Sequence, residues 1–230
     1  MSDLSRHRDY LVWGAVILGL SIILTLVLVP GGTVALDQRR SVSRTTPDGA
    51  AAWFRSLQEL GVNVEERFTD LDTEPPGGGG LALLEPLVDL SAREVHNVLE
   101  FVRDGGTLVY APGIVSPLED SVAYDVIVYP PDPYGLTTYR DSLVEHRWTE
   151  EPWAWDTPRT IRIGVDDEIV DGWEILAMGE LAGTSLGWMP VGDGGILFVA
   201  DGRELSNGIL TDSEIAVTAT RAVVDLLGDE

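Results

Sequence analysis

The amino-acid sequence predicts an α/β domain with a mostly parallel sheet and helices on both faces, preceded by one transmembrane helix. Three observations lead to this prediction. A charge-free apolar run spans residues 10–29, two later segments are short and continuously apolar, and the clearest helices carry their apolar residues at helical spacing. Continuously apolar strands are typical of parallel sheets because helices cover both faces of such sheets.

The composition of the 230-residue chain excludes several classes of function. There is no cysteine, which excludes disulfides, thiolate metal sites and a cysteine nucleophile. The chain has 38 Asp and Glu against 15 Arg and no Lys, a formal net charge of −23. Because binding to phosphates needs many cations, we expect no nucleic-acid partner. The acidity fits a high-salt interior or ordinary surface acid, and both interpretations place it in solvent.

Residues 10–29 form the predicted membrane anchor, between a tail at 1–9 and a linker at 30–45. At a rise of about 1.5 Å per residue, a helix of this length crosses a hydrocarbon core of about 30 Å. Tyr10 and Trp13 lie near one end, where aromatic rings favour the membrane interface. We therefore expect this segment to lie in membrane lipid.

The flanks of this run bear on cleavage and orientation. The run is long for a signal peptide, and residues 33–35 are a poor cleavage site, so we expect an uncleaved anchor. Arg6 and Arg8 lie closer to the run than the arginines at 39–44 do. This asymmetry predicts a single-pass protein of the cell membrane, with its folded domain outside the cytoplasm.

The α/β domain is assigned to residues 46–230, and its first helix is marked by Thr46 as N-cap and Pro47 at the first helical position. Gly61 is the predicted stop. The residues at helical spacing on the predicted buried face are Ala50, Trp53, Phe54, Leu57 and Leu60.

A strand–helix–strand unit follows. Residues 81–84 are an apolar strand, Ser91 and Glu94 form a capping box at the start of a helix, and residues 107–110 form the next strand. Such a unit implies a right-handed crossover between parallel strands.

Residues 113–160 interrupt this pattern as a predicted irregular, Trp-rich insertion. Trp148, Trp153 and Trp155 cluster there among charges and prolines. These rings either line a binding surface or bury themselves against the sheet. Further strands are predicted at 126–129, 160–163, 173–177 and 185–188.

The last part of the domain ends with a strand and a helix. Residues 195–200 form a continuously apolar strand that leads to Asp201, and a turn is expected at 207–208. Thr211 and Glu214 form a second predicted capping box. The predicted core face of this helix consists of Ile215, Ala219, Ala222, Val223 and Leu226.

Together these segments resemble the domain-of-unknown-function 4350 family over residues 40–110 and 194–227. The motifs are Thr46-Pro47-Asp48-Gly49-Ala50, Leu83-Leu84-Glu85-Pro86, Leu90-Ser91-x-x-Glu94, Phe101-Val102-Arg103-Asp104-Gly105-Gly106-Thr107-Leu108-Val109, and the late Gly195–Asp201 strand leading to Asn207. The resemblance implies a flavodoxin-like fold, similar to class I glutamine amidotransferase and ThuA-like domains. Members are often encoded beside MoxR-type AAA+ ATPases and domain-of-unknown-function 58 proteins, which implies such partners by analogy.

Catalytic and metal-binding candidates are weak. Amidotransferase chemistry needs a cysteine, and this chain has none. Ser142 and His146 are spaced to share a helix face but lack a recognisable triad, and Ser116 lacks a nucleophile-elbow motif. The acidic run at 166–168 with Asp171 does not fit an EF-hand loop. We therefore expect no catalytic residue, no metal site and no cofactor.

The favoured function is a non-catalytic binding or scaffold domain that recognises a partner at the carboxyl ends of its parallel strands. The candidate binding residues are Pro112, Gly113, Asp201, Arg203 and Asn207. Arg203 either binds an anion there or forms a structural salt bridge. Two alternatives remain open, a membrane-tethered hydrolase that uses Ser or carboxylates with a metal, and an accessory subunit of a transporter.

Overall fold

The computed structural model describes residues 45–228 apart from gaps at 87–88, 113–117, 120, 123, 129–138, 150–153, 158–160, 166–170 and 180–182. The described helices are α2 (Ala51–Glu59), α3 (Ala92–Arg103) and α4 (Glu214–Leu227), with short 3₁₀ turns at Gly202–Leu205 and Leu210–Asp212. The described strands are β1 (Gly80–Leu84), β2 (Thr107–Ala111), β3 (Tyr124–Val128), β4 (Tyr139–Leu143), β5 (Ala154–Thr157), β6 (Ile161–Val165), β7 (Glu174–Gly179), β8 (Thr184–Val191) and β9 (Gly194–Val199).

The predicted membrane span at 10–29 lies outside the described residues. Within the described part of the chain, no helix combines the length and the apolar composition needed to cross a membrane.

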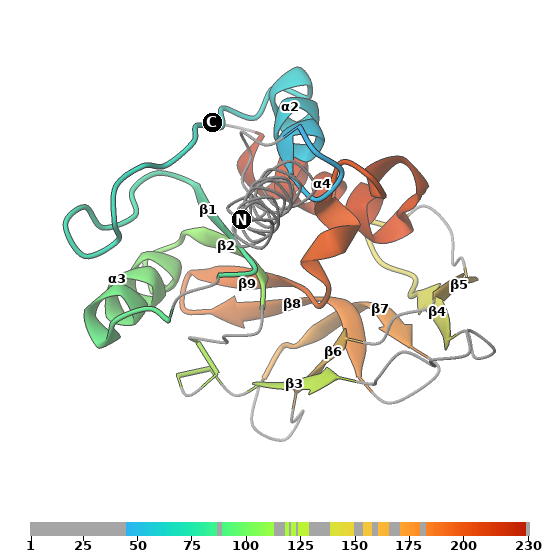
Figure 1. Ribbon diagram of the computed structural model, residues 1–230. Coiled ribbons are helices and arrows are strands. Elements are labelled where there is room, and N and C mark those ends of the chain that lie inside the picture. The colour runs from blue at the N-terminus through green and yellow to red at the C-terminus, as the bar shows by residue number, and fades with distance from the viewer. Residues whose placement is uncertain are drawn as a thin grey trace, which may run out of the picture. The chain divides into compact units, whose positions relative to one another are not determined.

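The described strands form one mixed sheet, so the prediction of a mostly parallel sheet is wrong. Its main path runs β1-β2-β9-β8-β7-β4-β5, and β6 connects β3 to β8 (Figure 1). Only β1, β2 and β9 are parallel neighbours, and every other described pair is antiparallel. The reason is the segment between β2 and β9, whose described parts add strands and contain no crossover helix.

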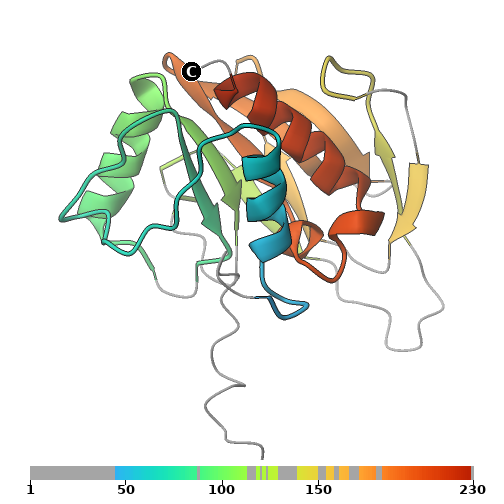
Figure 2. The ribbon, with the colours of Figure 1, turned by 90° about the horizontal axis from the view of Figure 1, so that it is seen from above.

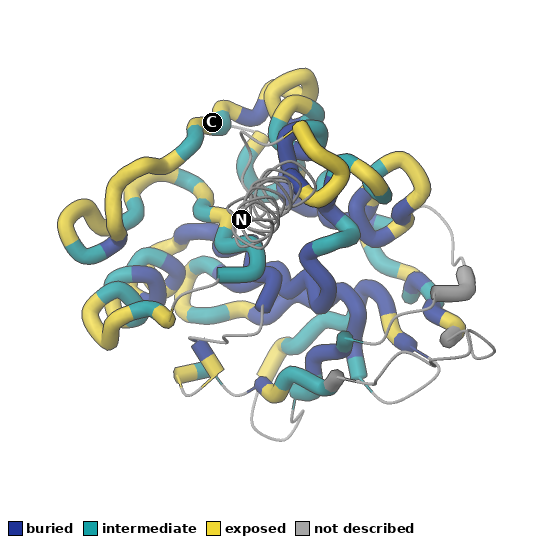
Figure 3. Tube along the Cα trace, viewed as in Figure 1, coloured by how far each residue is buried: buried dark blue, intermediate teal, exposed yellow. Residues whose placement is uncertain are grey.

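Helices cover both faces of the sheet, as predicted. In β2 and β9, Val109 and Leu197 face α2 and α4, whereas Leu108 and Ile196 face α3. Successive strand residues point to opposite faces, so these central strands are apolar throughout. Figure 2 shows α2 and α4 side by side on one face, where they contact each other. The β3–β6 pair packs beside α3 on the other face, and Figure 3 shows the strands between these layers as buried.

The helix starts test the capping predictions. Ser91 and Glu94 form both bonds of the predicted capping box on α3. The box predicted at Thr211 is wrong, because α4 begins at Glu214 and its N-cap is Ser213, whose Oγ accepts from Ala216 N at 3.0 Å. The intervening residues form a 3₁₀ turn instead, which moves the helix start.

The start of α2 also differs from the prediction. The helix begins at Ala51, and the predicted N-cap Thr46 belongs to a preceding turn closed by Gly49 N donating to Thr46 O at 2.9 Å. Gly61 does end the helix, with φ at +90°, the left-handed conformation that glycine adopts without strain.

Candidate functional site

The carboxyl ends of the parallel strands hold two of the predicted binding residues, Asp201 and Arg203. Asp201 is buried, and its Oδ1 accepts from both the backbone N and Nε of Arg203 at 3.0 Å. Arg203 Nη2 donates to Asp201 Oδ2, also at 3.0 Å. This bidentate contact points the guanidinium at the Asp201 carboxylate, which favours the salt-bridge interpretation of Arg203.

The same edge is filled by other groups of the chain. Glu85 follows β1 with φ at +47°, and its backbone N donates to Ala111 O at 2.8 Å. A Cβ added to Gly202 would lie 2.9 Å from Glu85 Cγ, so the Glu85 side chain lies against the Gly202 backbone. Pro112 is buried, and Gly113 lies outside the described residues. The described part of this edge is therefore packed by the chain itself.

Asn207, another predicted binding residue, holds the start of α2. Its Oδ1 accepts from Ala52 N at 2.6 Å, and its Nδ2 donates to Thr46 O at 2.7 Å. Ala50, at the N-cap position, has no side-chain acceptor of its own. Asn207 supplies the missing cap from a distant part of the chain, so both ends of its amide have a structural role.

Ser142 and His146, which were spaced to share a helix face, do not do so. Ser142 lies in β4 rather than in a helix, and His146 Nε2 contacts Glu174 Oε2 at 2.6 Å. Ser116 and residues 166–168 lie outside the described residues. Across the described residues, no group of three or more potential metal ligands comes together.

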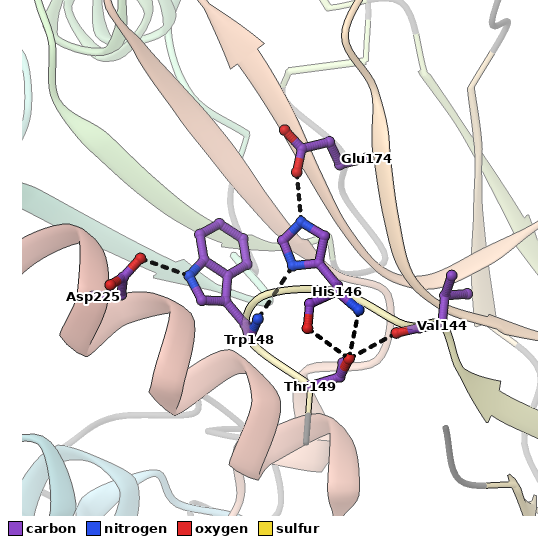
Figure 4. Close-up of polar contacts among 6 residues, drawn as sticks. All are labelled: Val144, His146, Trp148, Thr149, Glu174 and Asp225. Carbon is purple, nitrogen blue, oxygen red and sulfur yellow. Dashed lines mark hydrogen bonds and ion pairs between the residues drawn. The ribbon is translucent and has the colours of Figure 1, made fainter. Parts of the chain in front are cut away.

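The turn after β4 forms a compact polar network (Figure 4). Thr149 Oγ1 accepts from His146 N and donates to Val144 O, each at 2.8 Å. His146 Nδ1 accepts a long bond from Trp148 N at 3.4 Å, and Nε2 faces Glu174. Both ring nitrogens are therefore engaged within the turn and with β7.

Trp148 connects this turn to α4. The ring is buried, and its Nε1 donates to Asp225 Oδ2 at 2.9 Å. It also meets Trp188 edge-on, at 6.0 Å between ring centres, and the Arg147 guanidinium lies 4.4 Å from its centre. Of the two interpretations of the tryptophans, burial is correct for Trp148.

An open cavity of about 250 Å³ lies between α4 and Leu60, the residue that follows α2, next to this network, and is called the α2–α4 cavity below. Leu60 is 55% exposed beside it, although the sequence pattern predicts that Leu60 is buried. The helix ends one residue before Leu60, which releases this side chain from the core face. Trp53 Nε1 on α2 donates to Thr220 Oγ1 on α4 at 3.0 Å, and this hydrogen bond joins the two helices. The lining residues are Leu60, Thr220, Arg221, Val224 and Asp225.

A second charged cluster is fully internal. Asp141 on β4 pairs with Arg162 Nη2 on β6, and Ser185 Oγ on β8 donates to Asp141 Oδ2 at 2.8 Å. All three residues are buried. A Cβ added to Gly179 would lie 2.5 Å from Arg162 Nε, so this nitrogen faces backbone and leaves no room for a ligand. We assign this cluster to the architecture of the sheet.

The residues of α4 that line the α2–α4 cavity are not among those predicted from the sequence. The predicted core face of α4 omits Val217 and Val224, which are seven residues apart and share the outer face with Thr220. Val217 is 39% exposed. A second apolar stripe on an otherwise well-explained helix is the signal that indicates a second contact surface.

Comparisons with known proteins concern the family and the fold. A family model described as "Domain of unknown function (DUF4350)" matches residues 42–221, which confirms the resemblance. No curated protein matches the chain.

Among solved structures, the "mmIFT52 N-terminal domain" is similar with a TM-score of 0.60 and 13% identity, covering 83% of this chain and 96% of that one. A cytoplasmic protein, STM1381 from Salmonella typhimurium LT2, gives a TM-score of 0.53 and 13% identity, covering 78% and 87%. An exo-β-1,4-mannosidase, Op5Man5 from Opitutaceae bacterium strain TAV5, gives a TM-score of 0.46 and 17% identity. This match covers 77% of this chain but only 30% of the mannosidase. At these identities the likeness concerns the fold alone.

Proposed function

The chain belongs to the DUF4350 family, and we propose that it is a membrane-anchored, non-catalytic domain that recognises a partner protein. The recognition surface in this proposal is the cavity between α2 and α4 together with Leu60. This differs from the surface expected from the sequence, at the carboxyl ends of the parallel strands.

The size and lining of the cavity carry the proposal. Pockets for small ligands and cofactors measure about 300–1,000 Å³. The cavity here is smaller, about 250 Å³, and its lining includes the apolar side chains of Leu60 and Val224. It is suited to one apolar side chain of a protein partner, the kind of anchor that dominates binding at protein interfaces.

The polar network beside the cavity supports a non-catalytic role. A general base needs a nitrogen that can reach substrate. The two ring nitrogens of His146 contact Glu174 and the backbone of Trp148, and the side chain is mostly buried. The network therefore acts in this proposal as a support for the α2–α4 surface.

The proposal places the domain in a membrane complex. The apolar run at 10–29 is the anchor, the folded body lies outside the cytoplasm, and the complex includes a MoxR-type ATPase system by family analogy. Direct contact would then be made by a membrane-embedded member, for which a domain-of-unknown-function 58 protein is the candidate. A flavodoxin-like ancestry of the β1-α3-β2 and β9-α4 core is part of the same proposal.

Photo-crosslinking tests the recognition surface. A photoreactive amino acid at Leu60 in the full chain, in native membranes, should give one discrete adduct whose partner belongs to the ATPase system. Leu60 is exposed beside the cavity, so a docked partner comes within reach of the probe. Adding Val224→Asp should remove the adduct, because a carboxylate in the cavity wall opposes burial of an apolar anchor.

Phe68 provides the matched control. It is apolar and 86% exposed, and it lies outside the set of cavity-lining residues. The same probe at Phe68 should give no such adduct. Equal labelling from both positions, or an adduct at Leu60 that survives Val224→Asp, would show that the α2–α4 surface is not the recognition site.

Labelling a single cysteine tests the orientation. The chain has no cysteine, so Phe68→Cys creates one exposed thiol. A membrane-impermeant maleimide should label this variant in intact cells, because the body is proposed to lie outside the cytoplasm. Labelling that appears only after lysis places the body inside and contradicts the proposed orientation.

A further inference from the structure

Asp225 gives the cavity a chemical preference. It is an exposed residue of α4 that lines the cavity, and its Oδ2 accepts the Trp148 indole N–H. Because the indole is held by the buried turn, this bond fixes the direction of the carboxylate. In the described part of the chain, no ion pair joins Asp225 to an arginine.

The neighbouring arginine does not neutralise this carboxylate. Arg221 is one turn before Asp225 and also lines the cavity, and it has an interaction of its own, but no ion pair between Arg221 and Asp225 is present among the described residues. The cavity therefore presents an apolar wall from Leu60 and Val224 and a directed negative charge at its rim. Partners bind such a surface best when their charge is complementary.

We propose that the α2–α4 cavity binds a partner segment that carries one apolar side chain beside an arginine or lysine. This inference rests on the proposed function and adds the chemistry of the partner. The apolar side chain enters the cavity, and the cation pairs with Asp225. The net charge of −23 also favours approach of a basic segment over an acidic one.

Arginine fits this position better than a neutral polar residue. Asp225 Oδ2 already accepts one hydrogen bond, and a guanidinium offers several donors in one plane to the rest of the carboxylate. The indole of Trp148 holds the Asp225 carboxylate in place before the partner binds. Binding therefore costs little side-chain entropy at this residue.

The test uses three fluorescein-labelled peptides on one alanine–glutamine helical framework. The first carries Leu and Arg one turn apart, the second Leu and Glu, and the third Ala and Arg. Fluorescence anisotropy is measured at low salt with the full chain in neutral detergent micelles. The Leu–Arg peptide should bind about three- to tenfold more tightly than either of the others.

Two protein variants assign the charge preference to one residue. Asp225→Asn should remove the preference for Arg over Glu, while its amide oxygen still accepts the Trp148 N–H. Asp193→Asn is the control, because it removes one exposed negative charge at the β8–β9 turn, away from the cavity lining. It should leave the preference intact.

Each other outcome overturns the inference in a distinct way. Equal binding of the Leu–Arg and Leu–Glu peptides removes the charge preference but leaves apolar recognition standing. Equal binding of the Leu–Arg and Ala–Arg peptides shows general attraction to an acidic protein, and no binding of the Leu–Arg peptide rejects the basic partner. A crosslink from Leu60 to a second copy of the chain would identify self-association instead.

Discussion

Replacing Arg162 by Met should lower the free energy of unfolding by about 3–5 kcal/mol at neutral pH, the usual cost of leaving one buried charge without its partner. The remaining charge is Asp141, which is 1% exposed and keeps, among the described residues, only the Ser185 hydroxyl as a side-chain partner. Methionine has a similar length to arginine, so the loss is one of charge rather than of packing. Equilibrium urea unfolding of the full chain measures the change.

The effect should depend on pH in a defined direction. Burial raises the pKa of Asp141, although Arg162 and the Ser185 hydroxyl act to lower it. A carboxyl whose pKa is raised by folding adds stability that is fully present below its unfolded pKa and is lost as the pH rises through its folded pKa. Removing Arg162 raises the pKa of Asp141 further. The deficit of Arg162→Met should therefore be largest at neutral pH and shrink in acid.

A double variant separates this explanation from a packing defect. Arg162→Met combined with Asp141→Asn leaves no charge in the cluster, and the asparagine can still accept from Ser185. It should recover most of the lost stability at neutral pH. A double variant as unstable as Arg162→Met alone, or a deficit that does not change with pH, would show that the cost does not come from the unpaired carboxylate.

Replacing Trp148 by Ala should cost about 3–5 kcal/mol of unfolding free energy, the range for deleting a large buried aromatic side chain. Trp148 is buried, packs against Trp188 and donates its indole N–H to Asp225 on α4. Thermal and urea unfolding measure the loss.

The Trp148→Phe variant isolates the hydrogen bond. It keeps most of the aromatic volume but lacks the indole N–H, so it should cost about 1 kcal/mol beyond the change in volume. In a double-mutant cycle, Trp148→Phe and Asp225→Ala should cost less together than the sum of the single changes. Additive costs would mean that the Trp148–Asp225 bond contributes nothing to stability.

Local signals in the sequence predicted local structure well. The capping box at Ser91 and Glu94 is formed because both partners lie within one helical turn. The short apolar segments became β1, β2 and β9 because they combine strand-forming residues with burial. The predicted start of α4 was wrong because Thr211 and Ser213 are both competent caps, and the 3₁₀ turn that selects Ser213 depends on tertiary contacts such as Ser213 Oγ with Glu204.

Sheet direction and the candidate site depend on long-range pairing, which periodicity does not encode. Nothing in the residues of β4 or β7 indicates that they pair with each other rather than with a parallel neighbour. The role of Asn207 was likewise hidden, since its partners Thr46 and Ala52 are far away in sequence. The outer apolar residues of α4 can be seen in the sequence. That they lie beside Leu60 follows only from the packing of α2 against α4.

The position of β9 has a consequence for biosynthesis. β9 fills the space between β2 and β8, and α4, which covers it, comes later still. A chain emerging from the ribosome therefore lacks the middle of its sheet until β9 and α4 have been made. Contacts between distant segments slow folding, so the complete sheet should not form before then. If the folded domain is exported, the late completion of its sheet leaves the chain able to pass through a translocation channel before it folds. Folding would then finish on the far side of the membrane.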